Sequence, residues 1–104
     1  ELAIARIHNE FAQSLDMRIL AQELGVSYRW FRNPFTVHAR LSPHRYLMEF
    51  RIVSARNLLA GTDLSVKEIA LQTGFEDEHY FSRLFRQKLN VTPSQWRRRS
   101  QRHA

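Results

Sequence analysis

Apolar residues recur along this chain at helical spacing, and no stretch alternates apolar and polar residues as a half-buried strand would. Asp16 suits the N-cap of a helix, and Gly25 suits its end. Two apolar stripes, one before Asp16 and one after it, predict the first two helices: Ile4, Ile7 and Phe11, then Met17, Leu20, Ala21 and Leu24. The pattern therefore predicts an all-α chain.

A third helix is predicted to start after Ser27, which suits an N-cap. Ser42 followed by Pro43 predicts the start of a long helix, because the missing N–H of proline costs nothing at the first helical position. Gly61 is expected to end this helix. Its apolar residues lie on or near one face: Leu47, Phe50, Ala55, Leu58 and Leu59.

The second half of the chain repeats the first half. Three pairs of segments correspond at a shift of 49: Asp16-Met17 with Ser65-Val66, Leu20-Ala21 with Ile69-Ala70, and Gly25-Val26 with Gly74-Phe75. After one extra residue the shift is 50, and further positions correspond: Phe31 with Phe81, Phe35 with Phe85, Leu41-Ser42-Pro43 with Val91-Thr92-Pro93, and Tyr46 with Trp96. A repeat of this length indicates one supersecondary unit that is used twice.

Each unit has the order of a helix-turn-helix motif: a short helix, a glycine turn and a second helix, followed by Ser/Thr-Pro at the start of a third. Ala21 and Ala70 supply the small residue that the close crossing of the two helices needs. Gly25 and Gly74 supply a turn residue that tolerates positive φ. We predict three segments: a first helix-turn-helix subdomain over residues 1–42, a linker helix over 43–60 and a second subdomain over 61–104.

The second helix of such a motif buries one face and leaves another face polar and free to enter a DNA groove. In the second unit the predicted buried residues are Phe81, Leu84 and Phe85. The other faces combine hydrogen-bonding groups that suit base edges with cations that suit phosphates: Glu78, His79, Ser82, Arg83 and Arg86. Two copies of this arrangement favour DNA binding over a plain helical bundle whose polar faces are only solvated.

The composition agrees with a nucleic-acid partner. The chain has 16 Lys and Arg against 10 Asp and Glu, and this net charge of +6 favours polyanionic partners and salt-sensitive binding. An apolar fraction of 43% excludes a disordered tail. No apolar run approaches the ~20 residues that a membrane span needs. We therefore expect no membrane partner and a cytoplasmic location.

Other chemistries find little support in the sequence. The absence of cysteine excludes disulfides, thiolate metal sites and a thiol nucleophile. No nucleophile has a base at a recognisable spacing, and the acidic run Glu76-Asp77-Glu78 suits a helix start better than a catalytic pair. The histidines lack the i, i+4 pairing of a metal site: His8, His38, His44, His79 and His103. We expect no enzyme activity, no metal and no cofactor.

Three runs of the second half closely resemble the signature of the AraC/XylS family of transcription regulators: Ala70-Leu71-Gln72-Thr73-Gly74-Phe75, His79-Tyr80-Phe81-Ser82-Arg83-Leu84-Phe85-Arg86 and Val91-Thr92-Pro93-Ser94-Gln95-Trp96-Arg97. The resemblance covers the chain from about residue 4 to residue 97. It implies the C-terminal DNA-binding domain of such a regulator, with seven helices. It also implies two recognition helices in successive major grooves, with half-sites about 10–10.5 base pairs apart, and transcription control that is usually activation.

Carried over position by position, the family's base-contact residues are Arg29, Arg32 and Asn33 in the first recognition helix and Glu78, His79, Ser82 and Arg83 in the second. Arg83 matches O6 and N7 of guanine, Asn33 matches adenine, and Glu78 matches the N4 amine of cytosine. Five further residues are predicted to contact the DNA backbone: Ser27, Tyr28, Thr36, Lys67 and Arg86.

Pro34 departs from the family pattern, because it lies inside the predicted first recognition helix. A proline there deletes a backbone hydrogen bond and clashes with the preceding turn. One possibility is a kinked but continuous helix, which the spacing of Phe31 and Phe35 slightly favours. The other is that Asn33 caps a new helix starting at Pro34, in which case the family's base-contact positions do not transfer.

Arg40 is the second departure, because the family usually has glycine at this position. Positive φ is costly for arginine, whereas Asn90 at the matching position tolerates it better. Both departures lie in the first unit. We therefore hypothesise that the second unit carries most of the sequence selectivity and that the first contributes mainly affinity for the DNA backbone.

Partners beyond DNA follow from the resemblance. Family members usually carry a ligand-sensing or dimerisation domain, which we expect to be missing from this fragment. Contact with RNA polymerase is compatible with DNA binding and would use faces away from the DNA. The alternative function is non-specific nucleic-acid binding by a basic helical protein. The C-terminal arginines fit a phosphate clamp, a membrane-surface patch or a solvated helix end: Arg97, Arg98, Arg99 and Arg102.

Overall fold

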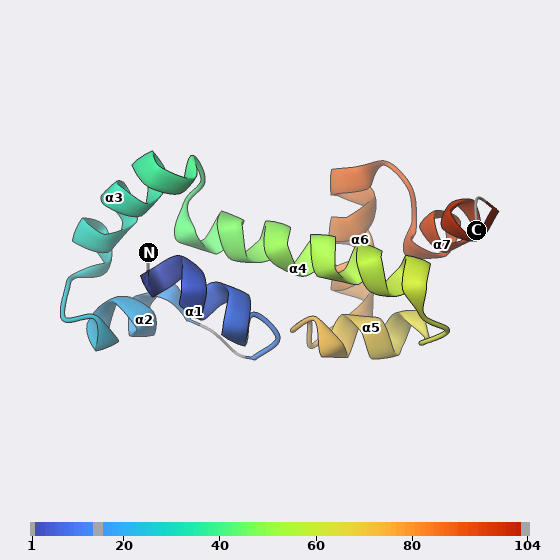
Figure 1. Cartoon of the computed structure of the whole chain (residues 1–104), viewed down its shortest axis with the longest axis horizontal. Coiled ribbons are helices and arrows are strands. Elements are labelled where there is room, and N and C mark those ends of the chain that lie inside the picture. Colours follow the sequence, from blue (N-terminus) through green and yellow to red (C-terminus); the bar gives the residue numbers. More distant parts are fainter. Residues whose placement is uncertain (1, 14–15, 103–104) are drawn as a thin grey trace. The chain divides into compact units, whose positions relative to one another are not determined.

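The computed structural model describes residues 2–13 and 16–102, apart from the side chains of Leu2, Trp30, Asn33, Pro34, Val37, His38 and Arg102. The described backbone forms helices and no strand, which confirms the predicted all-α class (Figure 1). The helices are α1 (Leu2–Glu10), α2 (Met17–Glu23), α3 (Tyr28–Ala39), α4 (Pro43–Gly61), α5 (Val66–Gln72), α6 (Glu78–Leu89) and α7 (Pro93–Arg102).

The chain divides into two compact units, unit 1 over residues 1–50 and unit 2 over residues 51–104. The division falls within α4, so each unit contains part of this long helix. Unit 1 contains the helix pair α2–α3, and unit 2 contains the pair α5–α6. The predicted separation into residues 1–42, 43–60 and 61–104 treats the linker helix as a segment of its own and stays a prediction.

The core of unit 1 consists of apolar residues from four helices: Ala3, Ile7, Met17, Leu20, Ala21, Phe31, Phe35 and Leu47. Ile4 and Phe11 pack against this core, as the first apolar stripe predicted. Leu24 does not belong to it, because Leu24 is the C-cap residue of α2 and is 37% exposed. The second predicted stripe is therefore confirmed except at its last position.

Aromatic side chains dominate the core of unit 2. Phe81 and Phe85 of α6 are fully buried, and the rings of Phe75 and Phe81 lie 5.1 Å apart. Leu84, which was predicted in the same buried stripe, is only half-buried. Arg51 of α4 is buried as well, with its guanidinium carbon 5.9 Å from the centroid of the Phe75 ring. Burial lowers the pKa of Arg51.

The helix α3 runs through Asn33 and Pro34 without interruption. The alternative in which a new helix starts at Pro34 is therefore wrong. The predicted continuity of the helix is confirmed, and the predicted kink stays a prediction. Phe31 and Phe35 are both buried, as their spacing predicted. The candidate positions of the first recognition helix consequently keep the same helical spacing as those of the second.

The residue directly after α3 and the one directly after α6 have a left-handed backbone. Arg40 follows α3 with a φ of 63°, and Asn90 is the C-cap of α6 with a φ of 61°. The backbone N–H of each residue donates a hydrogen bond to the carbonyl oxygen four residues earlier, and the N···O distance is 2.8 Å in both cases. The expectation of positive φ at both positions is confirmed. A left-handed backbone destabilises an arginine by about 1–2 kcal/mol.

Replacing Arg40 with glycine is expected to stabilise unit 1 by about 0.5–1 kcal/mol. Glycine adopts positive φ without a steric cost, and its greater freedom in the unfolded chain offsets only part of this gain. Urea unfolding followed by circular dichroism measures the effect. Asn90→Gly is the matched control and should change stability less, because asparagine already tolerates this conformation. A less stable Arg40→Gly variant would show that Arg40 is not strained.

Candidate nucleic-acid interface

The same tight turn joins the two helices of each pair. Gly25 and Gly74 have φ values of 77° and 98°, which an L-residue rarely adopts. The N–H after each glycine donates back to the first helix, to the carbonyl of Ala21 at 3.1 Å or of Ala70 at 2.9 Å. Both alanines are fully buried. The repeat in the sequence therefore corresponds to a repeat of the turn and of the helix crossing.

Polar side chains cap the starts of α2, α5 and α6. Asp16 caps α2, accepting a hydrogen bond from the N–H two residues later at 2.8 Å, as the sequence predicted. Ser65 caps α5 and forms a reciprocal capping box with Glu68. Asp77 caps α6 in the same way as Asp16 caps α2. The acidic run before α6 thus serves the helix start.

The predicted contact residues of α6 share one side of the helix, with Glu78 and Ser82 at the edge beside the buried Phe81 and Phe85. Their spacing places all five within less than half a turn of the helix circumference. Three of the side chains are exposed, namely His79, Arg83 and Arg86. The other two, Glu78 and Ser82, are half-buried. This face offers a carboxylate acceptor beside several donors, which is the mixture that base edges in a major groove require.

The corresponding face of α3 is more uniformly basic. Arg29 and Arg32 are exposed, Tyr28 is half-buried, and the side chain of Asn33 lies outside the described part of the chain. Thr36 is exposed, but its hydroxyl donates to the carbonyl of Arg32 at 2.8 Å. This bond has to break before Thr36 can donate to a phosphate.

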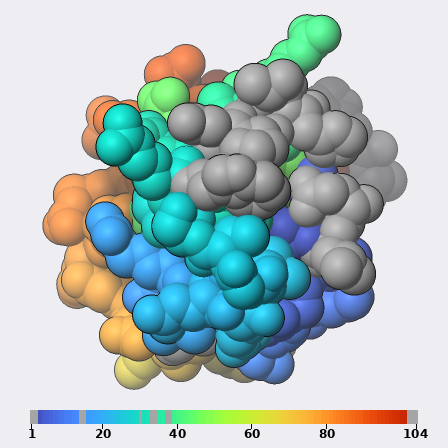
Figure 2. Space-filling model, turned by 90° about the vertical axis from the view of Figure 1, so that its left-hand side faces the viewer, coloured from blue at the N-terminus to red at the C-terminus, as the bar shows by residue number. Residues whose placement is uncertain are grey.

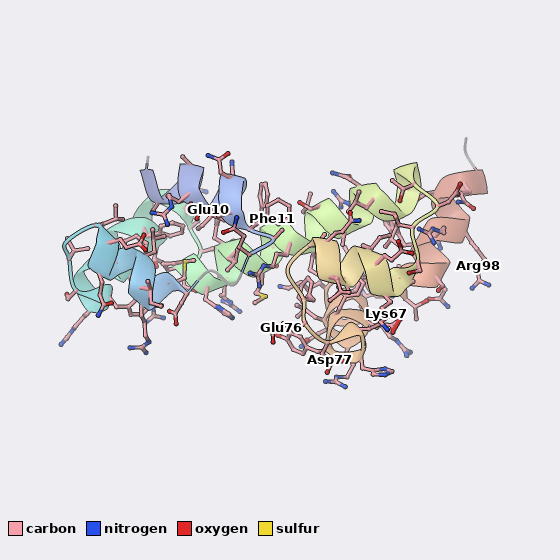
Figure 3. All side chains as sticks on the ribbon, turned by 90° about the horizontal axis from the view of Figure 1, so that it is seen from below. Glu10, Phe11, Lys67, Glu76, Asp77 and Arg98 are labelled. Atoms are coloured by element: carbon pink, nitrogen blue, oxygen red, sulfur yellow. The ribbon has the colours of Figure 1, made fainter. Side chains whose placement is uncertain are left out.

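Two residues that are predicted to contact the DNA backbone lie outside α3 and α6. Ser27 is exposed directly before α3, and Lys67 is exposed at the second position of α5. Figure 3 shows Lys67 on the surface of unit 2, together with Glu76 and Asp77. Unit 2 therefore has acidic side chains close to its candidate interface.

The helix α3 of unit 1 lacks this acidic component. The first turn of α3 has no acidic residue, whereas α6 begins with Glu78 directly after Asp77. The surfaces of α2 and α3 adjoin each other in Figure 2. The second helices of the two pairs thus differ in charge, because α3 carries no acidic residue and α6 begins with one.

Neither a metal-ligand cluster nor a membrane-spanning helix is found in the described part of the chain. No group of three or more metal-ligating side chains gathers there. His8 makes contacts within unit 1, with Nε2 2.8 Å from the hydroxyl of Tyr46 and its ring stacked on Phe50 at 4.4 Å. Among the described helices, none has the length and apolar character that a membrane crossing needs.

Comparison with known proteins agrees with this geometry. A family model described as a helix-turn-helix domain matches residues 20–99. The HTH-type transcriptional activator RhaS of Salmonella arizonae is 37% identical over 90 residues, which are 86% of this chain and 32% of RhaS. The chain belongs to the AraC/XylS family.

Two solved structures resemble this AraC/XylS-family chain closely. The C-terminal domain of AraT, a response regulator from Geobacillus stearothermophilus, has a TM-score of 0.90 at 32% identity, over 93% of this chain and 81% of that domain. The DNA-binding domain of the global transcriptional factor AdpA, solved in complex with a target DNA, has a TM-score of 0.91 at 25% identity, over 98% and 92%.

Membership of the AraC/XylS family establishes the class of the chain. It carries the helix-turn-helix DNA-binding domain of a transcription regulator, and its relatives are regulators rather than enzymes. The chain spans about a third of the length of the curated relatives that it matches. The individual DNA contacts stay predictions; those on α3 and those on α6 share one side of their helix, whereas Ser27 and Lys67 lie outside these two helices.

Proposed function

We propose that this chain binds a specific site in duplex DNA, with α3 and α6 in successive major grooves, and thereby activates transcription. The observation that carries this proposal is the duplicated helix-turn-helix pair, in which each second helix exposes a polar face. The similar AdpA domain was solved with a target DNA, and the related RhaS is named a transcriptional activator.

Selection of binding sites from a randomised duplex library tests the proposal. We expect two conserved blocks about 10–10.5 base pairs apart, because two recognition helices on one face of the duplex meet the groove one turn apart. Affinity should also fall steeply with salt, since phosphate contacts release counterions. Enrichment of no sequence at all would favour the alternative, a non-specific basic nucleic-acid-binding protein.

We further propose that unit 2 supplies most of the selectivity and unit 1 most of the backbone affinity. The basic first turn of α3 and the strained Arg40 support this division, as does the mixture of acceptor and donors on α6. The same selection tests it: one strongly conserved block would support the division, and two equally conserved blocks would contradict it.

Arg83→Ala is expected to relax selectivity at one base pair of the selected site. Loss of a two-pronged contact to guanine typically costs about 1–3 kcal/mol of discrimination, so preference at that position should fall by about 5- to 150-fold. Binding to the selected duplex and to single-base variants measures this. Arg86→Ala, from the same helix face, is the matched comparison and should weaken binding to all duplexes equally. The same uniform loss for Arg83→Ala would exclude base contact.

We also propose that the whole protein contains a ligand-sensing or dimerisation domain, because the chain spans only 32% of RhaS. In such a protein, contact with RNA polymerase would use surfaces away from the two recognition faces. A variant that has lost DNA binding but still binds polymerase would separate the two activities.

A further inference from the structure

Arg18 of α2 carries a charge that nothing in the described part of the chain neutralises through an ion pair. Its side chain is exposed, and its guanidinium carbon lies 4.9 Å from the centroid of the Tyr28 ring. Tyr28 is the first residue of α3 and packs against the buried Phe31, with the ring centroids 6.4 Å apart. A ring anchored in the core of unit 1 therefore holds the guanidinium at the surface.

Arg6 in the same unit is different. It pairs with Glu10, and its Nη2 lies 2.9 Å from a carboxylate oxygen of Glu23. The hydrogen bonds with Glu10 and then Glu23 raise the pKa of Arg6. The acidic residue nearest to Arg18 in sequence, Asp16, is engaged as the N-cap of α2. Arg6 is thus an internally paired arginine, whereas Arg18 is available to an external anion.

In the sequence repeat, Arg18 corresponds to a residue that was predicted to contact DNA. At the shift of 49 it corresponds to Lys67, the exposed lysine of α5 that was predicted to contact the DNA backbone. At the shift of 50, Tyr28 corresponds to Glu78, so unit 2 has no aromatic ring at the position that supports Arg18. The cation of unit 1, Arg18, therefore packs on an aromatic ring, whereas the corresponding cation of unit 2, Lys67, has no ring at the matching position.

We propose that Arg18, positioned by Tyr28, contacts a backbone phosphate of duplex DNA. The inference rests on the proposed function and extends it, because Arg18 is not among the contacts predicted from the sequence. A guanidinium donates two parallel N–H groups to a phosphate, which an ammonium cannot do. Because the ring already restricts the side chain, Arg18 loses less freedom when the phosphate binds. The contact adds affinity in unit 1 that does not depend on base sequence.

The test is the salt dependence of DNA binding by the full 104-residue chain. Replacing Arg18 with glutamine should reduce the slope of log K against log salt by about 0.9, the value for one phosphate contact. Binding to a selected site and to unrelated duplexes should weaken by the same factor. Arg18→Lys keeps the charge, so it should keep the slope while weakening the affinity. Arg6→Gln is the matched control and should leave the slope unchanged.

The positioning role of Tyr28 needs its own variants. Tyr28→Phe keeps the ring and removes the hydroxyl, whereas Tyr28→Leu removes the ring. We expect Tyr28→Leu to weaken binding more than Tyr28→Phe, and this difference to disappear in the Arg18→Gln background. Persistence of the difference in that background would overturn the positioning role.

Two further outcomes separate this inference from the proposed function. An Arg18→Gln chain with unchanged helix content and an unchanged slope would overturn the phosphate contact while leaving DNA binding intact. A wild-type chain that fails to bind any duplex DNA would overturn both.

Discussion

Replacing Phe81 with alanine is expected to lower the free energy of unfolding of unit 2 by about 3–5 kcal/mol. The Phe81 side chain is fully buried, and its ring lies 5.1 Å from that of Phe75 and 5.8 Å from that of Phe85. Alanine would leave a cavity that these rings can fill only in part. The total free energy of unfolding of a small domain is about 5–15 kcal/mol, so the variant of unit 2 would be only marginally stable.

DNA binding should fail for the same reason. Phe81 lies on the buried side of α6, away from the exposed His79, Arg83 and Arg86, so the substitution removes none of these side chains but loosens the packing of α6 against α5. Urea unfolding followed by circular dichroism measures the loss of stability. Tyr80→Ala, at the neighbouring residue of α6, is the control and should cost less than about 1 kcal/mol, because Tyr80 is 42% exposed. Equal losses for the two variants would contradict the central role of Phe81.

The fold followed from the sequence where local geometry leaves few choices. Only a residue that tolerates positive φ fits the turn at Gly25 and Gly74, and only a small residue fits the helix crossing at Ala21 and Ala70. These requirements recur at fixed spacing in both halves, so the repeat predicted the helix-turn-helix pairs. Continuity of α3 through Pro34 was left open, because local propensity and buried spacing favour different answers there.

Other features depend on three-dimensional packing that spacing does not specify. Leu24 fits the apolar period of α2 but lies at its C-cap and is exposed. Arg51 interrupts an apolar face of α4, yet it is buried against Phe75. The hydroxyl of Thr36 donates to its own helix, which the sequence does not reveal, and the predicted contact of Thr36 with the DNA backbone stays a prediction. In each case the partner of the side chain, rather than the residue type, decides its role.

The C-terminal arginines show the same limit. In the sequence Arg97 cannot be distinguished from Arg98 and Arg99, and a phosphate clamp, a membrane patch and a solvated helix end all fit the run. In the structure the half-buried Arg97 donates from Nε to the carbonyl of Leu59 at 3.2 Å. Its Nη2 donates to the carbonyls of Thr62, at 3.3 Å, and Leu64. Arg98 and Arg99 remain exposed, and the three interpretations stay open for them.

The second large effect is therefore expected at Arg97. Arg97→Met keeps most of the aliphatic side chain but removes every hydrogen bond to the end of α4 and to the loop before α5. Hydrogen bonds from a charged donor contribute about 1.5–3 kcal/mol each, but they are not additive when they share one side chain. We expect unit 2 to lose about 2–4 kcal/mol of stability, measured by urea unfolding.

Arg97→Lys should lie between wild type and Arg97→Met, because an ammonium keeps the charge but cannot bridge three carbonyls with the planar geometry of a guanidinium. Arg98→Met is the matched control, since Arg98 is the next residue of α7 and is exposed, and it should change stability by no more than about 0.5 kcal/mol. Faster amide hydrogen exchange at the start of α5 should accompany the Arg97 variants, because the loop before this helix loses its support. Equal unfolding midpoints for Arg97→Met and Arg98→Met would mean that the contacts of Arg97 contribute no stability to unit 2.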